Sequence, residues 1–199
     1  MCVTNSAAAR RARTHQAIAD AAALLFAEHG FSAVTIDEVA AAAGVARQTV
    51  FNHFAVKEDL VFDEIEEQRA ALLAAIRNRP AGSSAVAAVQ DQIIARWKTV
   101  RTVPDDGRPD SGIFRLVHHS PTLRARQLQL NAGTVDILAP ALGIEEPMIA
   151  TVIATALVAV EQALFDRMAA HVVAGGAVED VRDDLLAQAR RAFDRIGTQ

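Results

Sequence analysis

The chain has 199 residues, enough for one or two domains with a substantial core, and its formal net charge is −4. That charge, taken as a whole, does not favour a nucleic-acid partner. The single cysteine, Cys2, excludes an internal disulfide and indicates a reducing, cytoplasmic compartment. No secretion signal is recognisable, and the longest strongly apolar run, Met148–Val160, is about a third shorter than the ~20 residues that cross a bilayer. We therefore expect a soluble protein with no membrane partner.

Charge is distributed unevenly along the chain. No acidic residue precedes Asp20, whereas Arg10, Arg11 and Arg13 all stand before it. The sequence therefore predicts a basic N-terminal tail, and such a tail favours DNA as a partner in spite of the acidic total.

The first three expected helices are sharply bounded. Apolar spacing of three and four predicts a helix over about 11–29, which Gly30 closes. The segment Thr35–Glu38 has the T-x-x-E form of a capping box and begins a second helix that ends at Gly44. A third helix is expected over about 46–54, with Val50 and Phe54 on the inner face.

Helical spacing continues to the end of the chain, and strand-like alternation is almost absent. The segment Val103–Gly112 is rich in Pro, Asp and Gly and is expected to be a loop. Pro140 and Gly143 are expected to end a helix near residue 138. The further predicted helices cover about 57–79, 84–102, a short stretch through Phe114 and Leu116, 122–138, 145–173 and 178–196. The fold class is therefore all-α, with about nine helices.

The second and third helices, joined by a tight turn at Gly44, form a helix-turn-helix. With Val50 directed inward, the outer face of the third helix carries Arg47, Gln48, Thr49, Phe51 and Asn52. Gln and Asn side chains suit adenine, and Arg suits guanine. Because any surface helix has a polar outer face, this face alone favours an ordinary solvent-exposed helix. Together with the turn and the basic tail, it leaves DNA reading and ordinary solvent exposure as equal alternatives.

From Arg13 to about Leu60 the sequence resembles the DNA-binding domain of the TetR family of transcriptional regulators. The matching text is AAALLFAEHGFSAVTIDEVAAAAGVARQTVFNHFAVKEDL. It contains the LF-x-x-x-G-F ending of the first helix, T-x-x-x-V/I-A, AGV, the T-V/L-F/Y-x-H-F recognition helix and a lysine three residues later. The resemblance covers roughly the first third of the chain. It implies a helix-turn-helix DNA-binding domain with a basic tail over 1–56 and a helical effector-binding and dimerisation domain over 57–199.

The resemblance also implies roles for individual residues of this chain. Base contacts are implied for Arg47, Gln48, Thr49, Phe51, Asn52 and His53, and phosphate contacts for Thr35 and Lys57. Two positions depart from the family. Phe51 stands where the family often has Tyr, which removes a phenol–phosphate hydrogen bond. Ala46 stands where Ser or Thr often caps the recognition helix, a cap worth about 1 kcal/mol.

The last two expected helices carry more apolar surface than a one-sided role needs. One side can face its own domain and the other a second copy of the chain, so a homodimer with a four-helix interface is expected. The alternative is a helix buried wholly in its own core. The expected interface residues are Ile153, Leu157, Val160, Leu164, Leu185, Ala189 and Phe193.

An effector site among the middle helices is a further implication of the resemblance. The candidate lining residues are Gln90, Trp97, Phe114, His118, Gln127 and Asn131, each of which suits a core or surface position as well. A movement there would pass through the fourth helix to the two helix-turn-helix domains of the dimer, which we call the reading heads. The expected function is thus a dimeric repressor that a small-molecule effector releases from a palindromic operator.

Other classes of function are less favoured. The pair His118-His119 has no third ligand at coordinating spacing, and Asp105, Asp106 and Asp110 lack the alternation and closing Glu of a calcium loop. No P-loop, GxGxxG, HExxH or nucleophile motif occurs, so neither an enzyme nor a cofactor is expected. Two alternatives stay open: a helical ligand carrier or scaffold that has lost specific DNA reading, and a protein that coats DNA without sequence preference.

Overall fold

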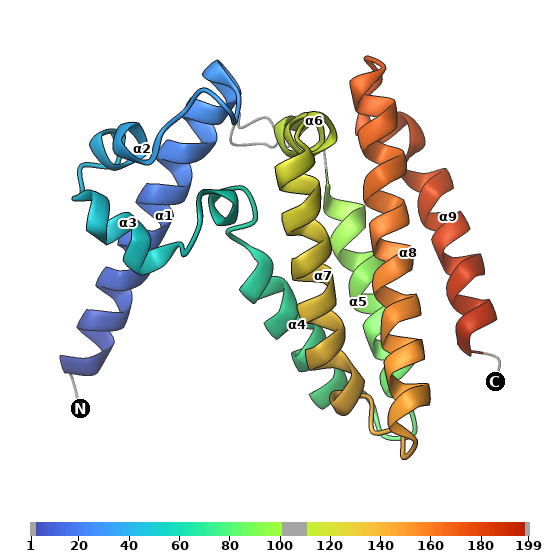
Figure 1. Ribbon diagram of the computed structural model, residues 1–199. Helices are drawn as coiled ribbons and strands as arrows, with labels where there is room; N and C mark the ends of the chain where they lie inside the picture. The colour runs from blue at the N-terminus through green and yellow to red at the C-terminus, as the bar shows by residue number, and fades with distance from the viewer. Residues whose placement is uncertain (1–2, 101–110, 198–199) are drawn as a thin grey trace. The chain divides into compact units, whose positions relative to one another are not determined.

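The computed structural model describes residues 3–100 and 111–197. Cys2 and the acidic loop residues Asp105, Asp106 and Asp110 lie outside these residues. Within them the chain forms nine α-helices, one short 3₁₀ helix and no strand (Figure 1). The prediction of an all-α fold is confirmed.

The contacts group the chain into two compact units, Met1–Asp63 and Glu64–Gln199. The 3₁₀ helix η1 (Lys57–Leu60) packs on α1 and belongs to the first unit. The division therefore follows η1, whereas the sequence placed the boundary at residue 56. We call these the first and the second unit.

The first unit holds three α-helices, α1 (Val3–His29), α2 (Ile36–Ala42) and α3 (Arg47–His53). α1 begins well before the expected start near Arg11. The segment before Arg11, which was expected to be a tail, is therefore helical as well, and Arg10 lies on α1 with Arg11 and Arg13. The alanines that precede them are the strongest helix formers and account for the extension.

Local signals fix the turn between α2 and α3. Thr35 and Glu38 form the predicted capping box at the start of α2. At its end the Val45 amide donates to the Ala40 carbonyl at 2.9 Å and the Gly44 amide to the Ala41 carbonyl at 3.2 Å. These two bonds are the Schellman pattern, which needs a left-handed residue, and Gly44 supplies it with a φ of +66°.

The core of the first unit forms where α1, α2 and α3 meet. Val50 and Phe54 are buried, as their spacing predicted. Val45, in the turn itself, is half-buried. The other main buried side chains are Ile18, Ala22, Phe26, Phe31, Val34, Val39 and Leu60. This core holds α3 by one face and leaves its opposite face in solvent.

The second unit is a helical bundle in which α8 contacts α6, α7 and α9, while α5 contacts α4 and α9. Figure 1 shows α7, α8 and α9 side by side. The helices are α4 (Ile65–Arg77), α5 (Ala85–Thr99), α6 (Ser111–His119), α7 (Pro121–Ala141), α8 (Pro147–Val173) and α9 (Val178–Gly197).

Further predicted boundaries differ from the structure. The helix expected over 57–79 is divided, because residues from Lys57 form a 3₁₀ turn and α4 begins only at Ile65. α7 continues through Pro140 to Ala141, although Pro140 has no amide hydrogen to donate to the carbonyl of Asp136. Gly143, with a φ of +70°, then reverses the chain.

An aromatic cluster of Trp97, Phe114 and Phe165 fills the middle of the bundle. The ring centroids of Trp97 and Phe114 are 6.4 Å apart, and those of Phe114 and Phe165 are 5.0 Å apart. Trp97 Nε1 donates to Glu161 Oε1 at 3.4 Å, and Arg96 forms an ion pair with the same carboxylate. Burial lowers the pKa of Arg96 to about 10, partly offset by the charge of Glu64. Arg96 is therefore still cationic at neutral pH.

Helix α8 is apolar over more than the face that it buries. Its most apolar 18-residue window has a mean hydropathy of 1.9, with 33% of that window buried, so its length and composition would allow a membrane crossing. The unbroken apolar run Met148–Val160 is shorter than this window, so the run alone does not reveal a segment of membrane-spanning length. Packed helices of soluble proteins pass the same test, so the feature is weak evidence for a span.

Candidate nucleic-acid interface

The outer face of α3 presents an amide row to solvent. Gln48 and Asn52 are both exposed and lie one turn apart, and Gln48 Nε2 donates to Asn52 Oδ1 at 3.2 Å. Phe51 beside them is 38% exposed. Each amide offers a donor and an acceptor in one plane, which matches the adenine edge in a major groove.

Arg47, at the start of α3, is held by two neighbours. Its Nη1 lies 2.7 Å from Asp37 Oδ2, and its guanidinium carbon lies 5.5 Å from the centre of the Phe51 ring. Both charged side chains are more than half exposed, and such surface pairs contribute only about 0.2–1 kcal/mol. Arg47 can therefore exchange Asp37 for a guanine at low cost.

Thr35 is exposed, but its hydroxyl already has partners. Its Oγ1 donates to Glu38 Oε2 at 2.8 Å and accepts from the Glu38 amide at 3.3 Å. The backbone amide of Thr35, and then its hydroxyl, hydrogen-bond the Glu38 carboxylate and lower the pKa of that group. A phosphate contact from the Thr35 side chain would require the hydroxyl to turn away from Glu38.

Lys57 is directed inward rather than toward solvent. Its Nζ donates to the Phe31 carbonyl at 2.5 Å and lies 4.3 Å from the centre of the Phe31 ring. Burial lowers the pKa of the Lys57 amine. The side chain thus ties η1 to the segment that follows α1, and a phosphate contact would need it to swing outward.

We expect Lys57→Met to reduce the free energy of unfolding by about 1.5–3 kcal/mol, because it removes a charged hydrogen bond and leaves the Phe31 carbonyl without a donor. If the phosphate role also holds, affinity for every duplex falls by the same factor. Urea unfolding and duplex titrations of the same preparation separate the two effects. Unchanged stability would show that the inward contact contributes nothing.

His53 lies at the inner edge of the outer face of α3, which we call the reading face. Its ring centroid is 5.8 Å from that of His15, which itself stacks on Phe54 at 4.4 Å. Burial lowers the pKa of His53, and the charges of Arg11 and His15 lower it further. The imidazole is therefore neutral at neutral pH and can donate one hydrogen bond and accept another.

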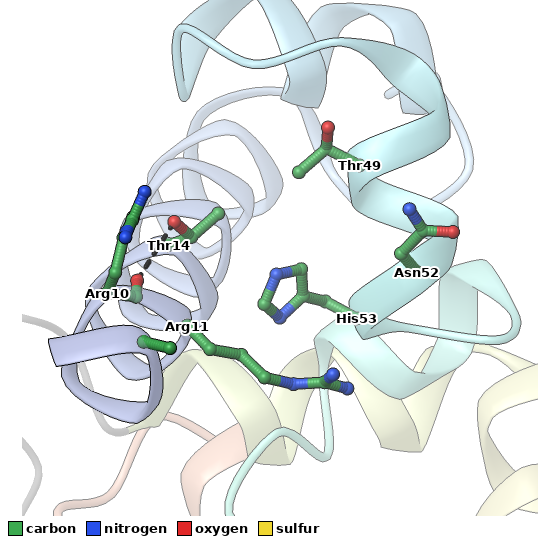
Figure 2. Close-up of a pocket in the computed structure, with 7 residues that line it drawn as sticks. Arg10, Arg11, Thr14, Thr49, Asn52 and His53 are labelled. Carbon is green, nitrogen blue, oxygen red and sulfur yellow. Dashed lines mark hydrogen bonds between the residues drawn. The ribbon is translucent and has the colours of Figure 1, made fainter. Parts of the chain in front are cut away.

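A hollow beside this face was not foreseen from the sequence. It lies between the N-terminal half of α1 and α3 and has a volume of about 360 Å³ (Figure 2). Only its basic residues left a signal in the sequence, as the excess of arginine before Asp20. Their placement against α3 depends on tertiary packing.

Comparisons with known proteins agree with this arrangement. The family model described as bacterial regulatory proteins, tetR family, matches residues 18–63, which cover the C-terminal part of α1, the helix-turn-helix and η1. MftR of Mycobacterium tuberculosis, assigned to transcriptional regulation of mycofactocin biosynthesis, is 29% identical over 132 residues, 65% of this chain and 64% of MftR. The transcriptional regulator TcmR of Streptomyces glaucescens is 31% identical over 120 residues, 59% of this chain and 53% of TcmR.

Residues 18–63 are a TetR-family regulatory domain. The chain's match spans less than two thirds of the length of MftR and TcmR. A solved structure extends the likeness of fold to the second unit. NalD of Pseudomonas aeruginosa, the secondary repressor of the MexAB-OprM multidrug efflux pump, superposes with a TM-score of 0.58 at 20% identity, over 92% of this chain and 97% of NalD.

The residues predicted to line an effector site in this TetR-family chain fall into separate places. Trp97 and Phe114 meet in the buried aromatic cluster. Gln127 and Asn131 meet through Gln162 of α8, which donates to Gln127 Oε1 at 3.2 Å and accepts from Asn131 Nδ2 at 2.6 Å. The remaining two lie elsewhere: Gln90 bonds the Phe193 carbonyl, and His118 is exposed with its ring edge-on to His119. Among the described residues no group of three metal-binding side chains occurs.

Most of the residues predicted for a dimer interface are buried inside the protomer. Leu157 and Leu164 of α8 are buried against the bundle, and Ile153 and Val160 are half-buried. On α9 the same holds for Leu185, Ala189 and Phe193. Apolar spacing cannot distinguish the inner from the outer face of α8, because both faces are apolar. The residues that it selected lie on the inner faces of α8 and α9. The outer face of α8 instead exposes Met148, Ile149 and Val152.

Proposed function

We propose that this TetR-family protein is a DNA-binding transcriptional repressor, which holds a palindromic operator as a homodimer and leaves it when a small-molecule effector binds. The observation that carries the proposal is the exposed row of Arg47, Gln48 and Asn52 on α3. The turn at Gly44 and the buried Val50 fix that helix from behind. Fixed amide and guanidinium groups on a protruding helix are the chemistry of base reading in the major groove.

The homodimer is supported by the outer face of α8. Exposed residues recur there at spacings of three and four, and Met148 and Val152 are 80% and 61% exposed. Farther along the helix the same face carries Thr155, Ala159 and Ala163, all exposed. Large apolar side chains at one end and small ones beyond allow a second α8 to approach closely. Two reading heads held by such an interface would match the two halves of a palindrome.

The effector site is proposed for the bundle around Trp97 and Phe114, the two candidates that the fold buries together. Helix α4 can transmit a movement from this site, because its Arg69 forms hydrogen bonds to α7. Arg69 Nε donates to Thr134 Oγ1 at 3.1 Å, and its Nη2 to the Leu130 carbonyl at 2.7 Å. An effector that moves α7 would therefore move α4. A coupling of about 1–3 kcal/mol would weaken operator affinity about 5- to 150-fold.

Selection of duplexes from a random-sequence pool tests the proposal. The expected result is enrichment of one inverted repeat whose half-sites lie about one helical turn apart or a multiple of it. Enrichment of a single unpaired half-site would contradict the dimer but not the reading head. A pool that stays random while the protein still binds small apolar ligands would favour a carrier over a regulator.

A further inference from the structure

The hollow between α1 and α3 has a polar lining with no acidic side chain. It receives two guanidinium groups, two hydroxyl groups, one amide and one imidazole. In Figure 2 Arg11 extends from α1 toward α3 and passes below His53. The polar lining residues are Arg10, Arg11 and Thr14 of α1 and Thr49, Asn52 and His53 of α3. These are hydrogen-bond donors and positive charges gathered around one open volume.

Among the residues that the structure describes, neither arginine of the hollow is paired with a carboxylate. Both are exposed, and within residues 3–100 and 111–197 no ion pair engages Arg10 or Arg11. The nearest acidic residue along α1 is Asp20, which accepts a hydrogen bond from Gln16. The local charge of this part of α1 is therefore positive and uncompensated, unlike that of Arg47 with Asp37.

The hollow adjoins the reading face directly. Thr49 and Asn52 line it, and they also belong to the outer face of α3. When α3 lies in a major groove, a sugar-phosphate strand must pass along each side of the helix, because the groove is about 12 Å wide. One of these strands would then run past the mouth of the hollow.

We propose that the hollow binds a backbone phosphate of the DNA, with Arg10 and Arg11 of α1 as its charged contacts. The inference rests on the proposed function and adds to it a second helix that grips the duplex. Arg is suited to this role because its planar fork can donate two hydrogen bonds to one phosphate. Contacts to phosphate orient a reading helix without adding sequence information.

His53 supports the assignment through its surroundings. The charged and titratable groups that face it are Arg11 and His15 of α1, and both disfavour its protonated form. A phosphate in the hollow would offset the charge of Arg11 and raise the pKa of His53. In the free protein, Arg11→Ala should also raise that pKa, whereas removal of a more distant arginine should not. Proton NMR titration of the His53 ring resonances measures both shifts.

The main test compares Arg10→Ala and Arg11→Ala with Arg13→Ala. All three arginines are exposed on α1, but Arg13 does not line the hollow, so the control loses the same charge from the same helix. Affinity for a selected duplex and for a shuffled one is measured between about 50 and 200 mM salt. Arg10→Ala and Arg11→Ala should each reduce the slope of the logarithm of affinity against the logarithm of salt concentration by about 0.9, equally for both duplexes. Arg11→Lys should retain most of the steepness.

The outcomes separate this inference from the proposed function. A wild-type protein that binds no duplex would contradict both. In a second outcome, the wild type prefers its selected duplex while Arg10→Ala and Arg11→Ala bind no differently from Arg13→Ala. That result would overturn the phosphate site alone. A change in the preferred sequence on Arg11→Ala would also overturn it, since it would mean contact with bases. Helical content measured by circular dichroism should be unchanged in all variants, because the three side chains are exposed.

Discussion

Gln48→Ala is expected to weaken binding of the selected duplex by about 1–3 kcal/mol, which is about 5- to 150-fold, and to relax the base preference at one or two positions in each half-site. The reason is that Gln48 presents an exposed, planar amide on a helix fixed by its buried face. Asn52→Ala should act in the same way at a neighbouring position. Titration of duplexes with single base changes measures both effects.

The hydrogen bond between Gln48 Nε2 and Asn52 Oδ1 adds a second expectation. Because each amide orients the other, the double variant should lose less affinity than the sum of the two single losses. Gln16→Ala, which removes an exposed amide from α1, is the matched control and should leave the base preference unchanged. If both α3 variants behave as Gln16→Ala does, α3 is not the reading helix.

Phe114→Ala is expected to have the largest effect on stability, a loss of about 3–5 kcal/mol from the free energy of unfolding. Phe114 is 2% exposed and lies between the rings of Trp97 and Phe165, so its removal leaves a cavity that neither rigid ring can fill. Chemical denaturation followed by Trp97 emission measures the loss. The emission of the folded state should shift as well.

Leu128→Ala is the control for this change, because Leu128 is an apolar residue of the same unit that is 61% exposed. Its stability should stay within about 0.5 kcal/mol of the wild type. A Phe114→Ala protein as stable as Leu128→Ala would mean that the aromatic cluster does not form in solution. It would also remove the basis for an effector site at Trp97.

The parts that the sequence predicted correctly depend on local chemistry. The capping box at Thr35 and the turn at Gly44 are determined by residues within a few positions of one another, and both were expected. The inward placement of Val50 and Phe54 follows from helical spacing alone. These features place the reading face, so the candidate site was largely visible before the fold.

The features that the sequence did not predict depend on contacts between distant segments or on competing signals. Spacing shows that α8 is apolar but not which of its apolar faces meets its own bundle, where Leu157 and Leu164 lie buried. The inward turn of Lys57 depends on the carbonyl of Phe31, 26 residues away. The hollow needs α1 and α3 to lie side by side, and no spacing within either helix predicts it.

The most direct test of the central claim, sequence-specific DNA binding, is fluorescence anisotropy with the duplex upstream of the protein's own gene and a shuffled duplex of the same composition. Both are measured over a range of salt concentrations, because phosphate contacts weaken with salt whereas base contacts preserve the difference between the duplexes. A preference of about tenfold or more for the native duplex that persists as salt rises is the predicted result. Equal affinities that fall steeply together, both for this duplex and for those recovered by selection, would contradict the claim and indicate a protein that coats DNA without reading it.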